Sequence, residues 1–528
     1  MSHGTELGDP RSVVTVDTRP FSILVGALAS VLACGGSGGD GGGSGTTGGG
    51  TGSNSSSDTT NIADETGQDP TGGGGDVDAC AVGAGVFDES VVHQLSLQLS
   101  DDDWAAMIQE AEDSPEYGGP DKTYFDAEFV FDGTPLPSPL AVRLKGHSSL
   151  LVAREQGHSF PLKLDFDRVD PEQTFDGLTK LNLHTNLDGI TAVNEYLSYG
   201  AIRAHGVPTA RVGFARVTVN GEELGLYTLV EHMQGKFIRC HYDEPFGDLY
   251  KPEEPIGNLA WRGPAIADYE PEIQFKWPDM SGTDHASILE LITVVNQQGV
   301  EAFASVLDET QALTYHAMNV GVGNYDYYAS FGHNYYLYES TPGRFIMLPW
   351  DMNFSQTVLP DPCGYGRNTE EWPISNKLLG DSARVQEYLG ILEEFLMGAA
   401  SPQILNARLD AVLPVLGIAS DAPQVQELRD AIDLRVQLQL DAIAAGVDVC
   451  PEFADGSERD ECDMCIDTTC KSEIVACYED RDCECVADCV AEDEPREQCV
   501  QRCGLTRTPA LFDALLQCIV GPCGEPCQ

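Results

Sequence analysis

A low-complexity tract of glycine, serine, threonine and aspartate, residues 35–79, sets the strongest limit on how this chain can fold. It holds almost no apolar side chains, so it cannot bury enough surface to offset the entropy of ordering its backbone. We therefore expect a flexible tether there, with the folded part of the chain beginning at Cys80. The chain as a whole is 42% hydrophobic, which indicates a folded body rather than a disordered acidic chain.

The residues before the tract are typical of an export signal. Arg19 precedes the apolar run FSILVGALASVLA, residues 21–33, which is too short to span a bilayer comfortably. The run ends in VLAC, residues 31–34, which resembles the bacterial lipobox. That resemblance implies a lipoprotein signal peptide over residues 1–34, with Cys34 lipidated and the protein anchored in the cell envelope, at the outer membrane or cell surface. An ordinary cleaved signal is the alternative.

The cysteines divide the chain into two parts. Of 17 cysteines, 13 lie from Cys450 onward, and the others are Cys34, Cys80, Cys240 and Cys363. Without Cys34 an even number remains, which suits disulfide pairing in an oxidising compartment. We expect residues 450–528 to form a separate disulfide-rich module. Its CDMC and CEC segments are also compatible with zinc, but export favours disulfides.

The net charge excludes one class of partner. The chain carries 84 acidic against 30 basic residues, a formal charge of −54. Such a surface repels nucleic acid and anionic membrane and attracts basic proteins and divalent cations. A nucleic-acid-binding function is therefore not expected, and membrane contact is expected only through the lipid anchor.

Residues 80–449 show the patterns of an α+β domain with two lobes. Residues 91–113 indicate a strand, an aspartate cap and a helix around Trp104, and alternating strands follow over residues 123–166. Residues 191–206 have helical spacing, and residues 210–232 form a hairpin whose turn is Asn220-Gly221. Residues 284–319 and 383–446 are mainly helical and flank an aromatic, strand-rich block.

Seven stretches of this body resemble one family. They are VRLKGHSS (142–149), SFPLKLDF (159–166), TAVNEYLSYGAIRAHGVP (191–208), VTVNGEELGLYTLVEHM (217–233), GDLYKPE (247–253), NYDYYASFGHNYYLYE (324–339) and LPWDMNFS (348–355). In order and spacing they are similar to the CotH kinase family, the secreted, atypical protein-kinase-like proteins first known from spore coats. The resemblance covers most of residues 88–400 and implies a two-lobed, protein-kinase-like fold that uses ATP with Mg²⁺ or Mn²⁺.

The resemblance also assigns roles to residues. Asp326 and Asp351 stand among aromatic residues, where a carboxylate is costly to bury without a partner. Asp326 resembles the catalytic carboxylate, and Asp351 resembles the metal-binding aspartate, with Asn334 as a second metal ligand. Lys163 resembles the phosphate lysine and Glu195 the helix glutamate that orients it. The alternative is structural: Asp326 caps a turn and Asp351 forms a buried ion pair.

Further residues are secondary candidates for nucleotide binding. Arg143, Lys145, Ser148 and Ser149 lie in or beside KGHSS, which lacks the glycine spacing of a Walker loop. Glu231 lies where a kinase places the hinge that contacts adenine, and there backbone groups matter more than side chains.

One departure from the family pattern leaves the function open. The family commonly has Trp-Asp-x-Asp, and here the last position is Asn353. The resemblance implies transfer of the ATP γ-phosphoryl group to Ser or Thr of exported proteins, with a basic protein as a substrate that the charge favours. A pseudokinase acting as an adhesion or assembly module is the alternative, and a phosphotransferase that transfers AMP or acts on glycans is a third possibility. Neither an HExxH zinc motif nor a GxSxG nucleophile elbow occurs.

Overall fold

The computed structural model describes most of the body and part of the cysteine-rich region. The described residues are 78–447 apart from 115–121, 147, 157–158, 187–189, 245, 254–256, 271–272, 279–282, 360 and 365–371, together with 450, 483, 486, 496–503, 505 and 507–520. Cys34, the signal and most of the tether lie outside them. Two compact units result: the body, and the C-terminal region that contains α17 (Arg496–Arg502) and α18 (Ala510–Val520). Among the described residues, no helix has both the length and the apolar character needed to cross a bilayer.

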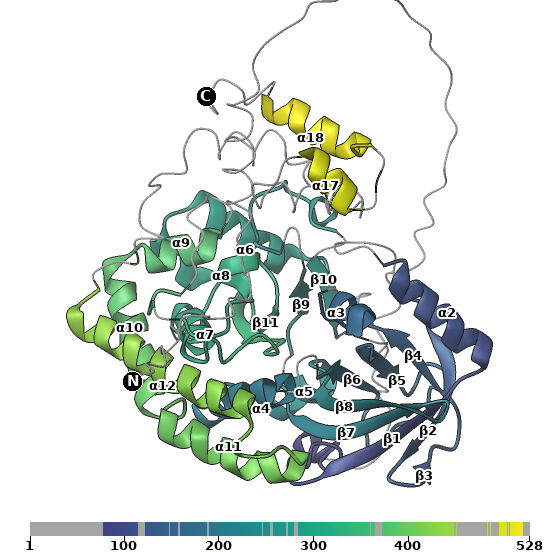
Figure 1. Ribbon diagram of the computed structural model, residues 1–528. Coiled ribbons are helices and arrows are strands. Elements are labelled where there is room, and N and C mark those ends of the chain that lie inside the picture. The colour runs from purple at the N-terminus through teal and green to yellow at the C-terminus, as the bar shows by residue number, and fades with distance from the viewer. Residues whose placement is uncertain are drawn as a thin grey trace, which may run out of the picture. The chain divides into compact units, whose positions relative to one another are not determined.

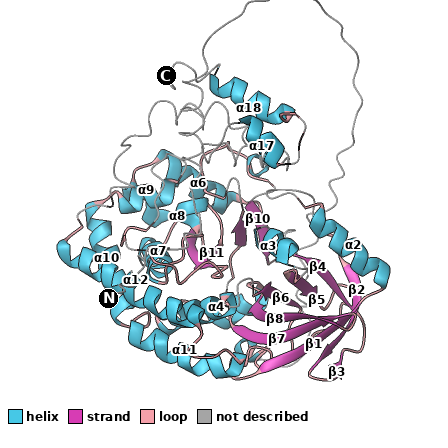
Figure 2. Cartoon of the chain, in the orientation of Figure 1, coloured by secondary structure: helices cyan, strands magenta, loops and turns pink. Residues whose placement is uncertain are grey.

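The N-terminal lobe of the body is built on an eight-stranded sheet (Figures 1 and 2). Its strands are β1 (Val92–Gln98), β2 (Phe125–Phe131), β3 (Thr134–Pro135), β4 (Leu140–Leu144), β5 (Leu162–Asp165), β6 (Lys180–Thr185), β7 (Val212–Val219) and β8 (Glu222–Glu231). The order is β1-β7-β8-β6-β5-β4-β2-β3, and β1 also pairs with β2. The sheet therefore closes on itself as a barrel, with β3 attached to β2.

Side-chain alternation explains what fills the barrel and what faces outward. Alternate residues such as Val142, Leu164 and Leu183 belong to one buried apolar cluster inside the barrel. The residues between them, including Lys163 and Asn182, occupy the outer faces of the same strands, because successive side chains of a strand point to opposite sides. Within residues 123–166 the predicted antiparallel strands are confirmed as β2, β4 and β5. The strand predicted over residues 140–149 ends at Leu144, and helix α3 (Ser148–Gln156) follows.

The helices and the turn that the sequence predicts for this lobe agree with the structure in all but one detail. Helix α4 (Thr191–Ala204) is confirmed, as is the β7–β8 hairpin with positive φ angles at Asn220 and Gly221. The predicted aspartate cap of α2 (Asp101–Glu112) is wrong. The N-cap is Ser100, whose hydroxyl accepts a hydrogen bond from the Asp103 N–H at 3.1 Å. The three aspartates form the first turn instead, where they complement the helix dipole.

The C-terminal lobe is mainly helical and holds a second, four-stranded sheet of order β10-β9-β11-β12. Its strands are β9 (Leu249–Pro252), β10 (Ile273–Trp277), β11 (Tyr335–Thr341) and β12 (Arg344–Pro349). The helices of the body not yet named are α5 (Gly235–His241), α6 (Ala286–Gln297), α7 (Glu309–Gly321), α8 (Tyr328–Phe331), α9 (Pro373–Leu379), α10 (Ser382–Met397), α11 (Pro402–Leu416) and α12 (Pro423–Ala445). Figure 2 shows the helices concentrated in this lobe and the strands in the other. The predicted α+β class is thus confirmed.

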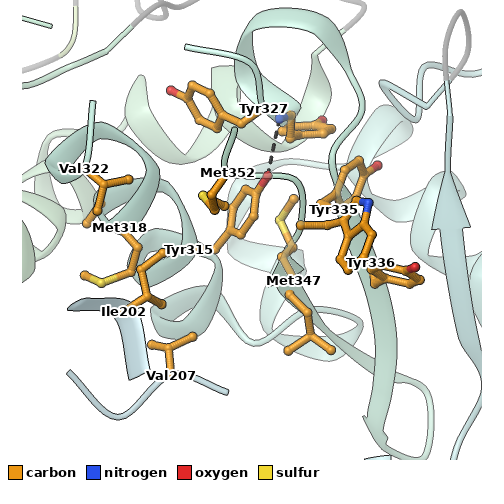
Figure 3. Close-up of a cluster of buried hydrophobic side chains, with 14 of the residues drawn as sticks. Ile202, Val207, Tyr315, Met318, Val322, Tyr327, Tyr335, Tyr336, Met347 and Met352 are labelled. Carbon is orange, nitrogen blue, oxygen red and sulfur yellow. Dashed lines mark hydrogen bonds between the residues drawn. The ribbon is translucent and has the colours of Figure 1, made fainter. Parts of the chain in front are cut away.

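The aromatic block forms the core behind the loops at the ends of these strands. Tyr315, Tyr327, Met318 and Met352 belong to one buried cluster (Figure 3). The Tyr315 hydroxyl accepts a hydrogen bond from the Tyr328 N–H at 3.3 Å. This core fixes the backbone on both sides of the segment that carries Asp326.

Two disulfides connect distant parts of the body. Cys80 pairs with Cys240 at the end of α5, and Cys363 pairs with Cys450. Cys483, Cys499 and Cys503 are also disulfide-bonded. Bonds of this kind are typical of proteins outside the cytoplasm.

Candidate active site

The outer faces of β4, β5 and β6 carry rows of polar side chains. Arg143, Lys163 and Asn182 are register partners across the three strands and form one row. Asp165 and Lys180 form a second row, and their side chains lie 3.4 Å apart with only 3% of each exposed. Polar residues are rarely buried in such numbers without a purpose in binding or catalysis.

The first row concentrates positive charge in a strongly acidic protein. Lys163 is only 3% exposed. Burial, together with the neighbouring charges of Arg143 and Lys180, holds the pKa of Lys163 well below its usual value. Lys251, on β9 of the other lobe, also acts electrostatically on Lys163. Cations from both lobes therefore meet here, as a polyanionic ligand requires.

Beside this row, a hydrogen-bonded chain joins a lysine to a glutamate. The Lys145 ammonium lies 2.7 Å from His184 Nε2, and His184 Nδ1 lies 2.8 Å from Glu195 Oε1. His184 is at the end of β6, and Glu195 lies on α4 with no exposed surface. Lys145 is only partly covered, yet burial lowers its pKa to about 8 despite the opposing charge of Asp351.

Asp351 follows β12 and faces this chain from the other lobe. Its φ is +53°, and its backbone N–H donates to the Tyr199 hydroxyl of α4 at 2.9 Å. One carboxylate oxygen lies 3.9 Å from His184 Nδ1, and the side chain is 23% exposed. Burial alone would raise the pKa of Asp351, but electrostatic interactions with His184, Lys145 and Lys251 outweigh it and lower the pKa.

Asp326 lies between α7 and α8, where two neighbours hold its side chain. His333 Nε2 contacts one carboxylate oxygen, and the Asn334 amide donates to the other at 2.9 Å. The same amide donates to the Asp326 carbonyl at 3.0 Å. His333 also acts electrostatically on Asp351, so the two aspartates border one site.

The residues around Asp351 fit a divalent cation. His184, Glu195 and Asp351 each place one ligand atom within 4.8 Å of the others. Among the described residues of this part of the site, four buried side-chain oxygens have no hydrogen-bond partner: Glu195 Oε2, Asp351 Oδ1, Asn194 Oδ1 and Asn353 Oδ1. Unpaired buried oxygens are costly, and hard-oxygen donors are what Mg²⁺ and Mn²⁺ prefer.

A small pocket lies at the other end of the polar rows. Lys180, Glu231, His232, Gln234 and Trp277 are among the residues that line it. Burial and the charges of Lys163 and Lys180 hold the pKa of His232 well below its usual range, so the ring is neutral. The Glu231 carboxylate is engaged elsewhere, because it accepts from the Arg211 side chain at 2.9 Å. The pocket thus offers a ligand backbone groups, a neutral imidazole and the Trp277 ring, with the lysines Lys180 and Lys236 also in its lining.

The structure brings most of the predicted residues together. Asp326, Asp351 and Asn334 border one site, and Arg143, Lys145, Lys163 and Glu195 stand on the opposite wall. Gly146 has φ +74°, and a Cβ there would meet the Ser149 hydroxyl at 2.3 Å, so the chain turns tightly between Lys145 and α3. Ser148 begins α3.

Sequence reasoning missed two residues of the site. His184 lies in a strand, KLNLHT, that was not recognised as part of the sheet. Lys251 pairs with Glu253 on β9; burial lowers its pKa, but Glu253 and other anionic groups outweigh that effect and the net shift is upward. For the strand KLNLHT, which carries His184, the available signal was the alternation of Leu181 and Leu183 with polar residues.

Comparison with known proteins identifies the family. A family model described as CotH kinase protein matches residues 142–418, more than half of the chain. The chain belongs to the CotH kinase family. No curated protein matches it. Among solved structures it is similar to a chain of the Shewanella oneidensis MR-1 toxin–antitoxin system HipA, HipB and operator DNA complex. The identity is 12%, the match covers 65% of this CotH-family chain and 72% of that chain, and the TM-score is 0.32.

Proposed function

We propose that this CotH-family protein is a metal-dependent protein kinase that transfers the γ-phosphoryl group of ATP to Ser or Thr hydroxyls of exported proteins. One observation carries the proposal: a wall of buried cations on the outer face of a barrel stands opposite two aspartates of a second lobe. A triphosphate needs cations, and its transfer needs a carboxylate near the attacking hydroxyl. In this assignment the two lobes are those of a protein-kinase-like fold.

Asp326 is the residue assigned to the substrate hydroxyl. In the reaction, a bond forms between the hydroxyl oxygen and the γ-phosphorus, the bond from that phosphorus to the β–γ bridging oxygen breaks, and ADP leaves. Asp326 accepts or orients the hydroxyl proton. The contacts from His333 and Asn334 hold its carboxylate in one orientation, so the group is placed before substrate arrives.

Asp351, Asn353 and Glu195 are the residues that would hold Mg²⁺ or Mn²⁺, because each has a buried oxygen without a hydrogen-bond partner. When bound, the metal supplies neutralisation of phosphate charge. Asn334 was predicted as a ligand as well; its amide nitrogen points to Asp326, which leaves its amide oxygen available. Asn353 keeps an oxygen donor where the family commonly has aspartate, which favours an active kinase over a pseudokinase.

The pocket between Lys180, His232 and Trp277 is assigned to the adenine ring. It has an aromatic side chain, a neutral imidazole and the backbone that follows β8.

The kinase is proposed to act outside the cytoplasm, which the disulfides support. The formal charge of −54 favours basic proteins as its substrates. The lipid anchor at Cys34 is part of the proposal.

Two measurements test this function. Thermal unfolding of the full chain with Mg-ATP or Mn-ATP should show stabilisation, about 2.7 kcal/mol at a ligand concentration one hundred times the dissociation constant. ATP labelled at the γ-phosphate should label exported proteins, while ATP labelled at the α-phosphate should not. Absence of any thermal shift with either metal would eliminate the kinase. Transfer of the α-label would reassign the protein as an enzyme that adds AMP, and binding without transfer would favour a pseudokinase scaffold.

A matched pair of variants controls the transfer assay. Asp326→Asn removes the proposed catalytic carboxylate, and Asp410→Asn makes the same charge change on an exposed α11 side chain paired with Arg429. The first should lose transfer and the second should retain it. Equal activities of the two variants would contradict the role of Asp326.

A further inference from the structure

The hydrogen-bonded chain from Lys145 through His184 to Glu195 has a defined direction. A lysine ammonium has only donors, so the 2.7 Å contact requires His184 Nε2 to accept. His184 is then neutral, and its Nδ1–H donates to the Glu195 carboxylate at 2.8 Å. The imidazole thus orients the lysine with respect to the glutamate without adding a charge of its own.

In the plan shared by kinases, a strand lysine pairs directly with a helix glutamate and meets the nucleotide phosphates. Here Glu195 reaches Lys145 through the ring of His184. Lys163 belongs to the next row of side chains along the strands. That row is two residues from the row of Lys145 and His184, which corresponds to roughly 7 Å along a strand. Its register partners are Arg143 and Asn182.

Accessibility also separates the two lysines. Lys163 is 3% exposed, whereas Lys145 is only partly covered and is acted on most strongly by the charge of Asp351 across the site. A phosphate can therefore reach Lys145 without moving the sheet, whereas Lys163 offers almost no surface to a ligand in this arrangement.

We infer that Lys145 is the lysine that binds the nucleotide phosphates and that His184 is a positioning residue that connects it to Glu195. This inference rests on the proposed kinase function. It replaces the assignment of the phosphate lysine to Lys163 and gives a role to an imidazole that a direct lysine–glutamate pair does not need.

The test is a double-mutant cycle on the full chain, with affinities for Mg-ATP and for adenosine measured by calorimetry. Lys145→Met should weaken ATP binding about 10- to 100-fold, the range for a hydrogen bond to a charged group, and leave adenosine binding unchanged. His184→Asn should weaken ATP binding about 10-fold. If His184 acts through Lys145, the double variant should bind ATP no more weakly than Lys145→Met alone.

Controls separate positioning from general damage. His93→Asn alters another buried histidine with an acidic partner, Asp132, at 2.7 Å from Nδ1, and should leave both affinities unchanged. His184→Gln places an amide oxygen where Nε2 accepts from Lys145, so it should bind ATP more tightly than His184→Asn. It also keeps the test valid if the asparagine variant fails to fold, as judged by thermal unfolding without ligand.

Several results would overturn the inference. These are a Lys163→Met variant that loses more ATP affinity than Lys145→Met, additive losses in the cycle, or a parallel loss of adenosine binding in the histidine variants. Failure of the wild-type protein to bind Mg-ATP and Mn-ATP would instead overturn the proposed function.

Discussion

Arg435 of α12 offers a test of what holds the Asp351 loop in place. It has no exposed surface, and among the described residues no carboxylate lies within ion-pair distance of it. Its guanidinium donates to the Thr357 carbonyl at 3.1 Å and to the Gln356 side-chain oxygen at 3.0 Å. Gln356 in turn donates to the Ser198 hydroxyl of α4 at 2.8 Å. One arginine thus connects α12, the loop after Asp351, and the helix that carries Glu195.

Replacing Arg435 by alanine leaves two buried acceptors without a donor. Each such acceptor costs about 1–3 kcal/mol, and the emptied volume adds to the loss. Removing an uncompensated buried charge offsets part of this, because burial already lowers the pKa of Arg435 to about 9. We expect Arg435→Ala to lower the free energy of unfolding by about 4 kcal/mol. Arg435→Met, which fills the space but still removes the donors, should cost about 2 kcal/mol.

The assay is urea unfolding of each variant. The free energies of unfolding are compared between variants whose unfolding free energy falls with urea concentration at the same slope. Arg429→Met is the matched control on the same helix, because Arg429 pairs with Asp410, whose side chain is 65% exposed. Exposed pairs contribute about 0–1 kcal/mol. A methionine variant at position 435 as stable as the wild type would refute the reasoning, since the guanidinium would then contribute no net stability.

Four further predictions concern the site and the frame around it. Asp326→Asn should lower the rate of phosphoryl transfer at least ~100-fold, the usual contribution of a positioned acid–base group, while the calorimetric Mg-ATP affinity stays near that of the wild type. Asp351→Asn should abolish the thermal shift that Mn-ATP produces, because it removes a charged ligand; an unchanged shift would contradict its role. Lys276→Met should be more stable than the wild type below pH 7. As the pH rises from 7 to about 10, the difference between the unfolding free energies of the variant and the wild type should decrease. Burial lowers the pKa of Lys276 to about 7, so above that pH the unfolded chain binds more protons than the folded one and stability rises with pH. Reduction of the Cys363–Cys450 disulfide, which closes a separation of 87 residues, should cost about 4 kcal/mol in urea unfolding, and stability unaffected by reductant would argue against it.

Local patterns in the sequence were sufficient for most of the elements. The Asn220-Gly221 turn and the apolar spacing of α4 depend on contacts within a few residues, and both are confirmed. The N-cap of α2 failed at one position, because Ser100 and Asp101 are both good caps and only the backbone geometry decides between them. The closure of the barrel through β1 and β2 joins residues that are thirty or more positions apart, and no local pattern indicates it.

The polar wall of the site was the hardest part to predict. The strand that contains Lys180 and His184 alternates apolar and polar residues, which is the pattern of a strand with one face in water. In this protein the polar face is buried against the other lobe. Alternation shows which residues share a face and not what covers that face, so the contact of His184 with Lys145 and Glu195 became visible only in three dimensions.

Closure of the N-terminal sheet also limits how a protein substrate can approach. Many peptide-binding domains capture an extended peptide as an added strand along an unpaired sheet edge. Among the described strands, β1 and β2 pair with each other and remove that edge, and the appended β3 has only two residues. In the second sheet the outer edge of β12 is already bonded, at Phe345 to the Val306–Asp308 backbone and at Met347 to the Gln311 side chain. A partner that binds by strand addition would therefore use β10.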